Sequence, residues 1–358
     1  MATLTQSFET STLFADNAGR LDYSLSEGEC IYLVLNQEYH LIPTAYSTYH
    51  LSLDGILRAC PLSVPDPTIS HSLMYNKVSI TAGPKDIGDS TGRVTLNFFT
   101  YKGGLFGKSA DEAADFCYFK PLSTDGKRKP ALRTGKEKVS YIAQTDQHVA
   151  LARADITLKS GLILSSIILY NSPIYSFSLQ GYIFSINANY QTICNAVANQ
   201  RPDVDANDIV SWKVWYSNGR INAEGVEFYL IDSRLNYREF VFINSISGIE
   251  HVISRGTFKI APTYNFASFR NNGDEGQLDS QPVEQMEVST GPIDNAKDRR
   301  LWLDMLRSDT VYMVDSDGEI RKIIIDDCSP SFTLKEVNEI TFKCHYAGRM
   351  VGNGTKYE

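Results

Sequence analysis

The sharpest pattern for chemistry in this sequence is a glycine-rich segment that contains a lysine and a serine. Residues 103–109 read GGLFGKS and follow a strand-like run at 94–101. A phosphate-binding P-loop needs a glycine, four further residues and then Gly-Lys-Ser, so that consecutive backbone amides surround the β-phosphate and the lysine reaches it. Lys102 occupies the position of the first glycine, and counting from Gly103 leaves the loop one residue short. We therefore interpret the segment as a glycine-rich surface loop rather than a nucleotide site.

The other residue types that serve in catalysis or metal binding are scattered. The six histidines lack a His-Glu-x-x-His spacing, no Gly-x-Ser-x-Gly elbow is present, and the cysteines include no Cys-x-x-Cys pair. Asp326 and Asp327 end a Walker B-like run, but it belongs to a predicted hairpin, and two carboxylates form a glycosidase pair only at a suitable separation in space. The sequence therefore predicts no enzyme, no cofactor and no metal site. We expect reduced thiols at Cys30, Cys60, Cys117, Cys194, Cys328 and Cys344.

The charge balance argues against nucleic acid as a partner. The chain has 358 residues, with 34 lysines and arginines against 42 acidic residues and a formal net charge of -8. Affinity for nucleic acid comes mainly from basic side chains that neutralise phosphates, and this chain has no excess of them. One basic stretch, 127–138, lies among glycine, proline and threonine and is interpreted as a linker. The amino terminus lacks the apolar core of a secretion signal, so export by that route is not predicted.

The stretch from Ser160 to Gln200 contains no charged residue. Its serine, asparagine and glutamine residues leave no run of about 20 apolar residues, so we predict no membrane span. Apolar residues alternate with polar ones as in a strand buried on one side, and their phase shifts by one residue at Gly181, which is typical of a β-bulge. The apolar residues of this alternation are the candidate subunit interface: Tyr175, Phe177, Leu179, Tyr182, Phe184 and Ile186.

Two interpretations of this uncharged stretch stay open. Strand edges without charged residues tend to pair with other chains, so burial between copies in a homo-oligomer would protect them. A closed ring would do so without leaving an open edge. The alternative is an internal core between two sheets of the same copy.

Alternating apolar residues and turn signals elsewhere predict hairpins. Because the chain is longer than one core usually organises, we expect several domains. The fold class is therefore mainly β, with multi-domain β-sandwich or β-barrel-like modules and a few short helices. The predicted domains are an N-terminal β-rich domain (1–150), a central β domain with the uncharged strand segment (151–260) and a C-terminal β domain with one packed helix (261–358). The predicted hairpins join 212–216 to 226–231, 240–243 to 249–253 and 311–314 to 320–325, and a last strand is expected at 340–346.

One helix is expected at about 294–307 and is predicted to pack on the terminal sheet. Asp294 is the expected N-cap, and the apolar stripe is Leu301, Trp302, Met305 and Leu306. Shorter helices are expected at 109–116 and 192–199.

Several segments of the second half recur together in one known family. They are YREFVFINS at 237–245, closing with GIE at 248–250, then STGP at 289–292, the helix with LWL at 301–303, S-x-x-V-Y-x-V at 308–314, and a strand that ends in Tyr346 and Ala347. Over about residues 205–350 the chain resembles uncharacterised virion proteins of tailed bacteriophages and prophages. These motifs are β-patterns and include no catalytic residues.

The resemblance implies a tail or baseplate component, with a distal-tail or tail-tip hub protein as the nearest role. Such a chain is made in the bacterial cytoplasm and resides in the virion, as a homo-oligomeric ring that contacts other tail or baseplate proteins. Its exposed loops would meet the next protein or a host-surface glycan. The chief alternative is a carbohydrate-binding or adhesive surface module, and a glycan hydrolase comes third.

Overall fold

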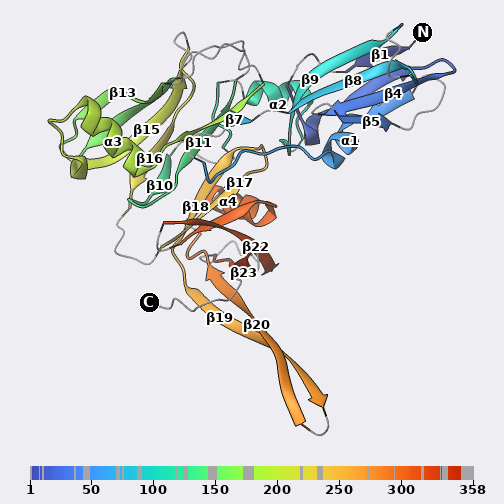
Figure 1. Cartoon of the computed structure of the whole chain (residues 1–358). Coiled ribbons are helices and arrows are strands. Elements are labelled where there is room, and N and C mark those ends of the chain that lie inside the picture. Colours follow the sequence, from blue (N-terminus) through green and yellow to red (C-terminus); the bar gives the residue numbers. More distant parts are fainter. Residues whose placement is uncertain are drawn as a thin grey trace. The chain divides into compact units, whose positions relative to one another are not determined.

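Figure 1 shows a computed structural model of the chain, in which β-strands predominate. The prediction of a mainly β protein with several sheets and a few short helices is confirmed. Contacts divide the chain into two compact units, unit 1 with residues 1–231 and 243–250, and unit 2 with residues 232–242 and 251–358. The predicted boundaries near 150 and 260 stay a prediction. The structure describes residues 2–347 except 8, 10–11, 36–37, 43–48, 70–72, 75, 87–90, 106, 118, 124–127, 144–150, 172–180, 218–220, 232–236, 272–273, 294, 316–317, 331 and 333–337.

The N-terminal part of unit 1 contains two sheets around one apolar core. Strand β8 (Lys77–Pro84) illustrates why they form, since Val78, Ile80 and Ala82 are buried while the residues between them are half-buried. Helix α1 (Leu53–Ala59) buries Leu53 and Leu57 in the same core. One sheet has the strand order β1 (Thr3–Gln6), β3 (Arg20–Ser24), β6 (Tyr49–Ser52), and the other β2 (Thr12–Phe14), β9 (Val94–Tyr101), β8 (Lys77–Pro84), β4 (Glu29–Leu35), β5 (Glu38–Ile42).

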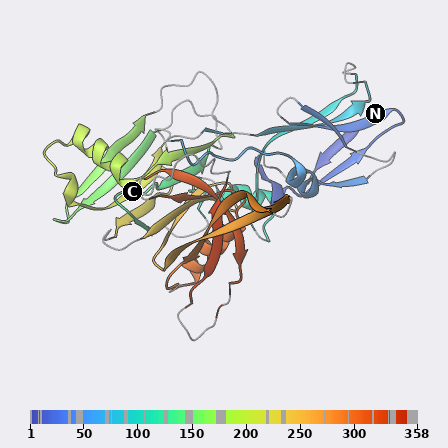
Figure 2. The same ribbon diagram turned by 60° about the horizontal axis from the view of Figure 1, so that its bottom comes forward.

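The rest of unit 1 contains a five-stranded and a three-stranded sheet around a second core. The predicted hairpin at 212–231 is confirmed, with Trp212 opposite Phe228 and both side chains buried. Helix α3 (Tyr190–Gln200) lies alongside the last strand of the larger sheet (Figure 1 and Figure 2). The larger sheet has the order β10 (Arg128–Ala131), β16 (Val226–Leu230), β15 (Ile209–Ser217), β12 (Leu151–Leu158), β13 (Ile163–Asn171), and the smaller one β11 (Lys138–Ile142), β14 (Ile183–Asn187), β7 (Leu73–Met74).

The interpretation of residues 127–138 as a linker is wrong. Strand β10 occupies part of this stretch and pairs in parallel with β16, and β11 begins at its end. Lys129 and Lys138 are only 6% and 7% exposed. Each of them has a polar partner far away in the sequence, Glu250 for Lys129 and Ile69 for Lys138, and such partners do not show in the local abundance of charge.

Unit 2 is built on one seven-stranded sheet with helix α4 (Ala296–Arg307) against it. Trp302 of α4 packs against Phe240 and Phe342 of the sheet. Both predicted hairpins and the last strand are confirmed. The strand order is β18 (Ile249–Ser254), β17 (Arg238–Ile243), β21 (Val311–Val314), β22 (Ile320–Cys328), β23 (Thr341–Tyr346), β20 (Asp274–Ser289), β19 (Phe258–Asn271).

The predicted helices are present with small shifts. In α4 the N-cap is Asn295, whose side-chain oxygen accepts from the amides of Lys297 and Asp298, each at 2.9 Å. The predicted N-cap, Asp294, lies outside the described residues. Helix α2 (Ala110–Phe116) follows the expected range, and α3 begins two residues before it.

Candidate functional site

The six candidate interface residues divide into two groups. Phe184 and Ile186 lie on β14 and are 8% and 3% exposed, in the second core of unit 1. These two side chains are therefore not available to a neighbouring subunit, and the internal core accounts for them. Tyr182 is half-buried. The remaining three, Tyr175, Phe177 and Leu179, lie outside the described residues, as does most of the segment in which the β-bulge was expected.

The uncharged stretch also forms strand β13, which contains none of the six candidate interface residues. Among the described strands, β13 is the last of its sheet. Three apolar side chains are exposed along or beside it, Leu162 by 53%, Ile163 by 57% and Ile168 by 40%. An edge strand with exposed apolar residues and no charge is a surface on which another chain can pair or pack.

Part of the β13 edge is already occupied by a side chain of its own unit. The Gln200 amide nitrogen donates to the carbonyl oxygen of Ile168 at 2.8 Å, and its oxygen accepts from the Ile168 amide at 3.1 Å. The side-chain amide of Gln200 thus makes the two hydrogen bonds to Ile168 that the backbone of a neighbouring strand residue would make. Nearby, Ser166 has a positive φ of 61° and the strand pairing shifts register, so the accessible edge begins at the Leu162 end.

The glycine-rich loop at 103–109 uses its backbone for contacts within unit 1. The Gly104 amide donates to the carbonyl oxygen of Ser245 at 2.8 Å, and the Leu105 amide donates to Asn17 Oδ1 at 2.6 Å. Asn17 also donates to the carbonyl oxygens of Leu105 and Lys108. The loop is therefore wrapped around protein groups rather than arranged as an open cradle for a phosphate.

The end of this loop continues into α2 through a capping box. The Ser109 side chain accepts from the Glu112 amide, and the Glu112 carboxylate accepts from the Ser109 amide at 2.9 Å. Lys108 forms an ion pair with Glu112 at 3.4 Å. The lysine and serine of the apparent P-loop motif thus contribute to the start of a helix.

The tip of the β17–β18 hairpin, residues 243–250, belongs to unit 1 and contacts this loop. Asn244 organises the turn, because its Oδ1 accepts from the amides of Ile246 and Gly248 while its Nδ2 donates to the carbonyl oxygen of Leu122 at 2.8 Å. The Ser247 hydroxyl donates to the carbonyl oxygen of Lys102 at 2.7 Å. Polar groups of the hairpin tip and of the segments that it contacts are thus hydrogen-bonded to one another.

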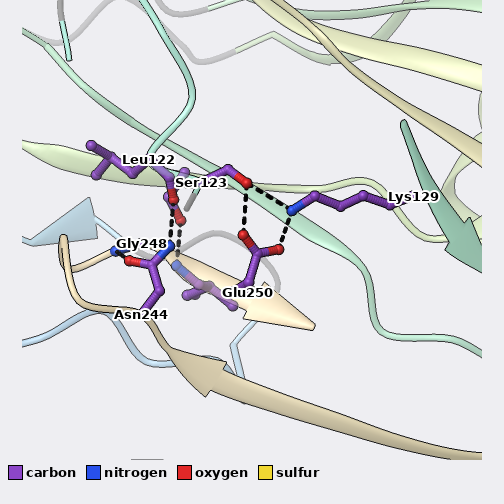
Figure 3. Close-up of polar contacts among 8 residues, drawn as sticks. Leu122, Ser123, Lys129, Asn244, Gly248 and Glu250 are labelled. Atoms are coloured by element: carbon purple, nitrogen blue, oxygen red, sulfur yellow. Dashed lines mark hydrogen bonds and ion pairs between the residues drawn. The ribbon is translucent and has the colours of Figure 1, made fainter. Parts of the chain in front are cut away.

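A buried triad of polar side chains lies beside Asn244 (Figure 3). The Lys129 ammonium of β10 donates to the Glu250 carboxylate of β18 and, at 2.8 Å, to the Ser123 hydroxyl. Ser123 in turn donates to the second Glu250 oxygen at 2.7 Å. The exposed fractions of the lysine and glutamate side chains are 8% and 1%. Because the charges neutralise each other inside the protein, the arrangement is suited to holding the hairpin tip in place.

Two further polar sites are the Lys138 amine, whose pKa is shifted, and the pair formed by Asp326 and His345. Burial lowers the pKa of the Lys138 amine to about 8, and this amine donates to the carbonyl oxygen of Ile69. In unit 2, Asp326 lies at a register shift of β22 and its carboxylate meets His345 Nδ1 at 2.7 Å. Asp326 is thus brought to a histidine of the neighbouring strand β23, and both Asp326 and Asp327 are exposed.

Sequence reasoning missed the triad, and within the uncharged stretch, where it placed the interface between copies at residues 160–190, it did not single out the exposed residues of β13. A signal for the triad exists, since Glu250 lies between Ile249 and the apolar pair Val252 and Ile253 in a predicted strand, and a carboxylate that is buried there requires a partner. Within the described residues, no group of three or more His, Cys, Asp or Glu side chains is arranged to hold a metal ion. None of the helices that the structure describes is long and apolar enough to cross a membrane. Comparison with protein-family models and with curated proteins finds no match for the chain.

Proposed function

We propose that this chain is a structural protein of a bacteriophage tail, a distal-tail, tail-tip or baseplate hub component that assembles as a ring through β-rich interfaces. The observation that carries the proposal is the β13 edge, where Leu162, Ile163 and Ile168 are exposed in a stretch of sequence without charge. Such an edge favours association, and a ring covers it in every copy.

The resemblance to phage virion proteins is the second support. The segments that carry it form β17, β18, α4, β21 and β23, which are all parts of the seven-stranded sheet or of the helix packed on it. Their residues, such as Phe240, Phe242 and Trp302, are buried core residues. A resemblance that includes many core positions of a sheet suits a shared building block, and it adds no catalytic residue.

The function is accordingly mechanical. Polar groups that could have served chemistry, such as Lys129, Glu250 and the amide of Gly104, are engaged in contacts that fix the fold. Rigid β-domains would stack around an axis, and their exposed loops would meet the adjacent virion protein or a host surface.

Native mass spectrometry and negative-stain electron microscopy of the purified chain test the ring. We expect a single closed oligomer with ring-shaped images at micromolar concentration. A monomer at every concentration, especially one retained by a glycan array, contradicts the proposal and supports the carbohydrate-binding alternative. For the location, antibodies against the chain should label the tail end of particles induced from the bacterium that carries the gene, and label confined to the cell surface contradicts it.

A further inference from the structure

Strand β13, the last of its sheet among the described strands, is interrupted twice along its length. Two of its residues, Ser165 and Ser166, face the single residue Asp155 of β12. Leu169 is a second extra residue, since the pairs on either side of it join neighbouring residues of β12. Extra residues of this kind are β-bulges, which bend a strand and disturb its ladder of hydrogen bonds. Ile168 lies between the two bulges.

Side chains of β12 hold the first bulge in place. Asp155 Oδ1 accepts from the Ser166 amide at 2.9 Å, and the Arg153 guanidinium donates to the Ser166 hydroxyl at 2.7 Å. The positive φ of Ser166 is a conformation that residues other than glycine adopt only where their surroundings impose it. The irregular edge is therefore a specified feature of the fold, and the Ser166 amide is already engaged.

The position between the bulges is closed by the last residue of α3. The Gln200 side chain donates to the carbonyl oxygen of Ile168 at 2.8 Å and accepts from the Ile168 amide at 3.1 Å. The same amide nitrogen donates to the carbonyl oxygen of Ala196 at 3.2 Å, which holds the side chain on its own helix. A strand added at this edge needs the same two backbone groups of Ile168, so it has to displace Gln200.

A strand edge without charged residues pairs with other chains unless something else protects it. Residues 160–200 contain no lysine or glutamate that would serve this purpose. We propose that the Gln200–Ile168 contact is an autoinhibitory one, which prevents the backbone of β13 from pairing with the β13 strand of a second copy. It leaves the exposed side chains of Leu162 and Ile163 as the part of this edge that is open to another chain.

This inference goes beyond the proposed function and does not depend on it, because an edge can be blocked in a monomer as well as in a ring. Each copy contributes one β13 edge, so pairing at an unblocked edge joins copies two by two. A monomer would become a dimer. A closed ring carries one such edge on every copy and would be linked to other rings, giving larger particles.

The test compares three variants of the full chain with the wild type. Gln200→Ala removes the blocking side chain, which is exposed at the end of α3. Gln191→Ala is the matched control, because Gln191 is an exposed residue of the same helix whose side chain donates to Asn195 of that helix at 2.9 Å. The third variant combines Gln200→Ala with Ile168→Lys, which places a protective charge at the freed position. Thermal unfolding confirms that each variant is folded.

Hydrogen exchange measures the contact itself in dilute protein. The Ile168 amide of Gln200→Ala should exchange at least about tenfold faster than that of the wild type or of Gln191→Ala, because its acceptor is missing. An unchanged exchange rate would overturn the inference.

Sedimentation velocity measures the consequence for association. Gln200→Ala should form species larger than those of the wild type at a concentration at least about tenfold lower, because the freed donor and acceptor become available to a second copy. The variant that also carries Ile168→Lys should associate no more than the wild type. Wild-type behaviour of folded Gln200→Ala, or undiminished association of the combined variant, overturns the inference. A monomeric wild type contradicts only the ring proposal, and Gln200→Ala should then convert the monomer to a dimer.

Discussion

Lys129 and Glu250 form an ion pair with 8% and 1% of their side chains exposed, although 121 residues separate them in the sequence. Ser123 hydrogen-bonds to both, so that each charged group keeps a second polar partner in the interior. A pair of this kind fixes which segments meet, because either charge left alone in the same place would be costly.

Substitution of Glu250 by Ala should therefore destabilise the protein strongly. The variant keeps the Lys129 ammonium in a buried site without its counter-charge, and we expect the free energy of unfolding to fall by about 3 to 5 kcal/mol. Urea unfolding followed by tryptophan fluorescence measures the change. The double variant Lys129→Met with Glu250→Leu should recover most of the loss, because it removes both charges.

The adjacent exposed pair is the control for this prediction. Arg128 and Glu227 lie 3.4 Å apart with 65% and 39% of their side chains exposed. Glu227→Ala should change the free energy of unfolding by less than about 1 kcal/mol. Equal losses for the two single variants would show that burial of the Lys129–Glu250 pair has no energetic consequence.

Two glycines of the same loop should respond differently to alanine. Both have positive φ, 81° at Gly103 and 71° at Gly107, so each substitution carries backbone strain. Only at Gly103 would a β-carbon overlap the carbonyl oxygen of Ser245, while at Gly107 no atom lies within 4 Å. We expect a melting temperature markedly lower for Gly103→Ala than for Gly107→Ala in calorimetry. Similar melting temperatures would contradict the close contact between the loop and the hairpin tip.

The Lys138 amine should add an alkaline pH dependence to stability. Burial lowers its pKa in the folded protein from 10.5 to about 8; nearby Asp66 raises this pKa to a smaller extent and Lys136 lowers it. Between pH 8 and the unfolded value the unfolded chain binds more protons, so the contribution of this group to stability rises with pH in that window. The free energy of unfolding of the wild type, minus that of Lys138→Met, should therefore increase from pH 7.5 to pH 10. A constant difference would show that the pKa is not lowered.

Buried thiols should be protected from alkylation. Burial raises the pKa of the Cys117 and Cys344 thiols to about 12, and the two residues are 1% and 0% exposed. Cys60 is less buried. In the native protein at pH 8, mass spectrometric mapping after brief alkylation should find Cys60 modified well before the other two. Rapid modification of Cys344 would contradict its place in the core of unit 2.

The sequence was sufficient for local strand pairs and insufficient for distant ones. The hairpin that places Trp212 opposite Phe228 was predictable because alternation and turn residues determine which neighbours pair. The parallel pairing of β10 with β16, for example Arg128 opposite Glu227, was not, because alternation specifies the buried face of a strand but not its partner. For the same reason the charge pattern of 127–138 favours a linker, although β10 lies within it.

The uncharged stretch shows a related limit. Phe184 and Ile186 are core residues, whereas Leu162 and Ile163 are exposed, although all four are apolar residues of strand-like segments. Apolar alternation identifies a face that avoids water, and it does not distinguish a face covered by the same chain from one open to another. What separates the two cases is the position of β13 at the end of its sheet, as far as the described strands go.

The Lys129–Glu250 contact also affects the order in which the protein can mature. During translation, residues 1–231 leave the ribosome before the segment 243–250 that completes their unit. Until Glu250 has been synthesised, the Lys129 ammonium has no counter-charge with which it could be buried. Unit 1 can therefore complete its packing only after the segment 243–250 has been synthesised. A fragment that stops at residue 231 would therefore contain most of unit 1 and still lack the residues that close it.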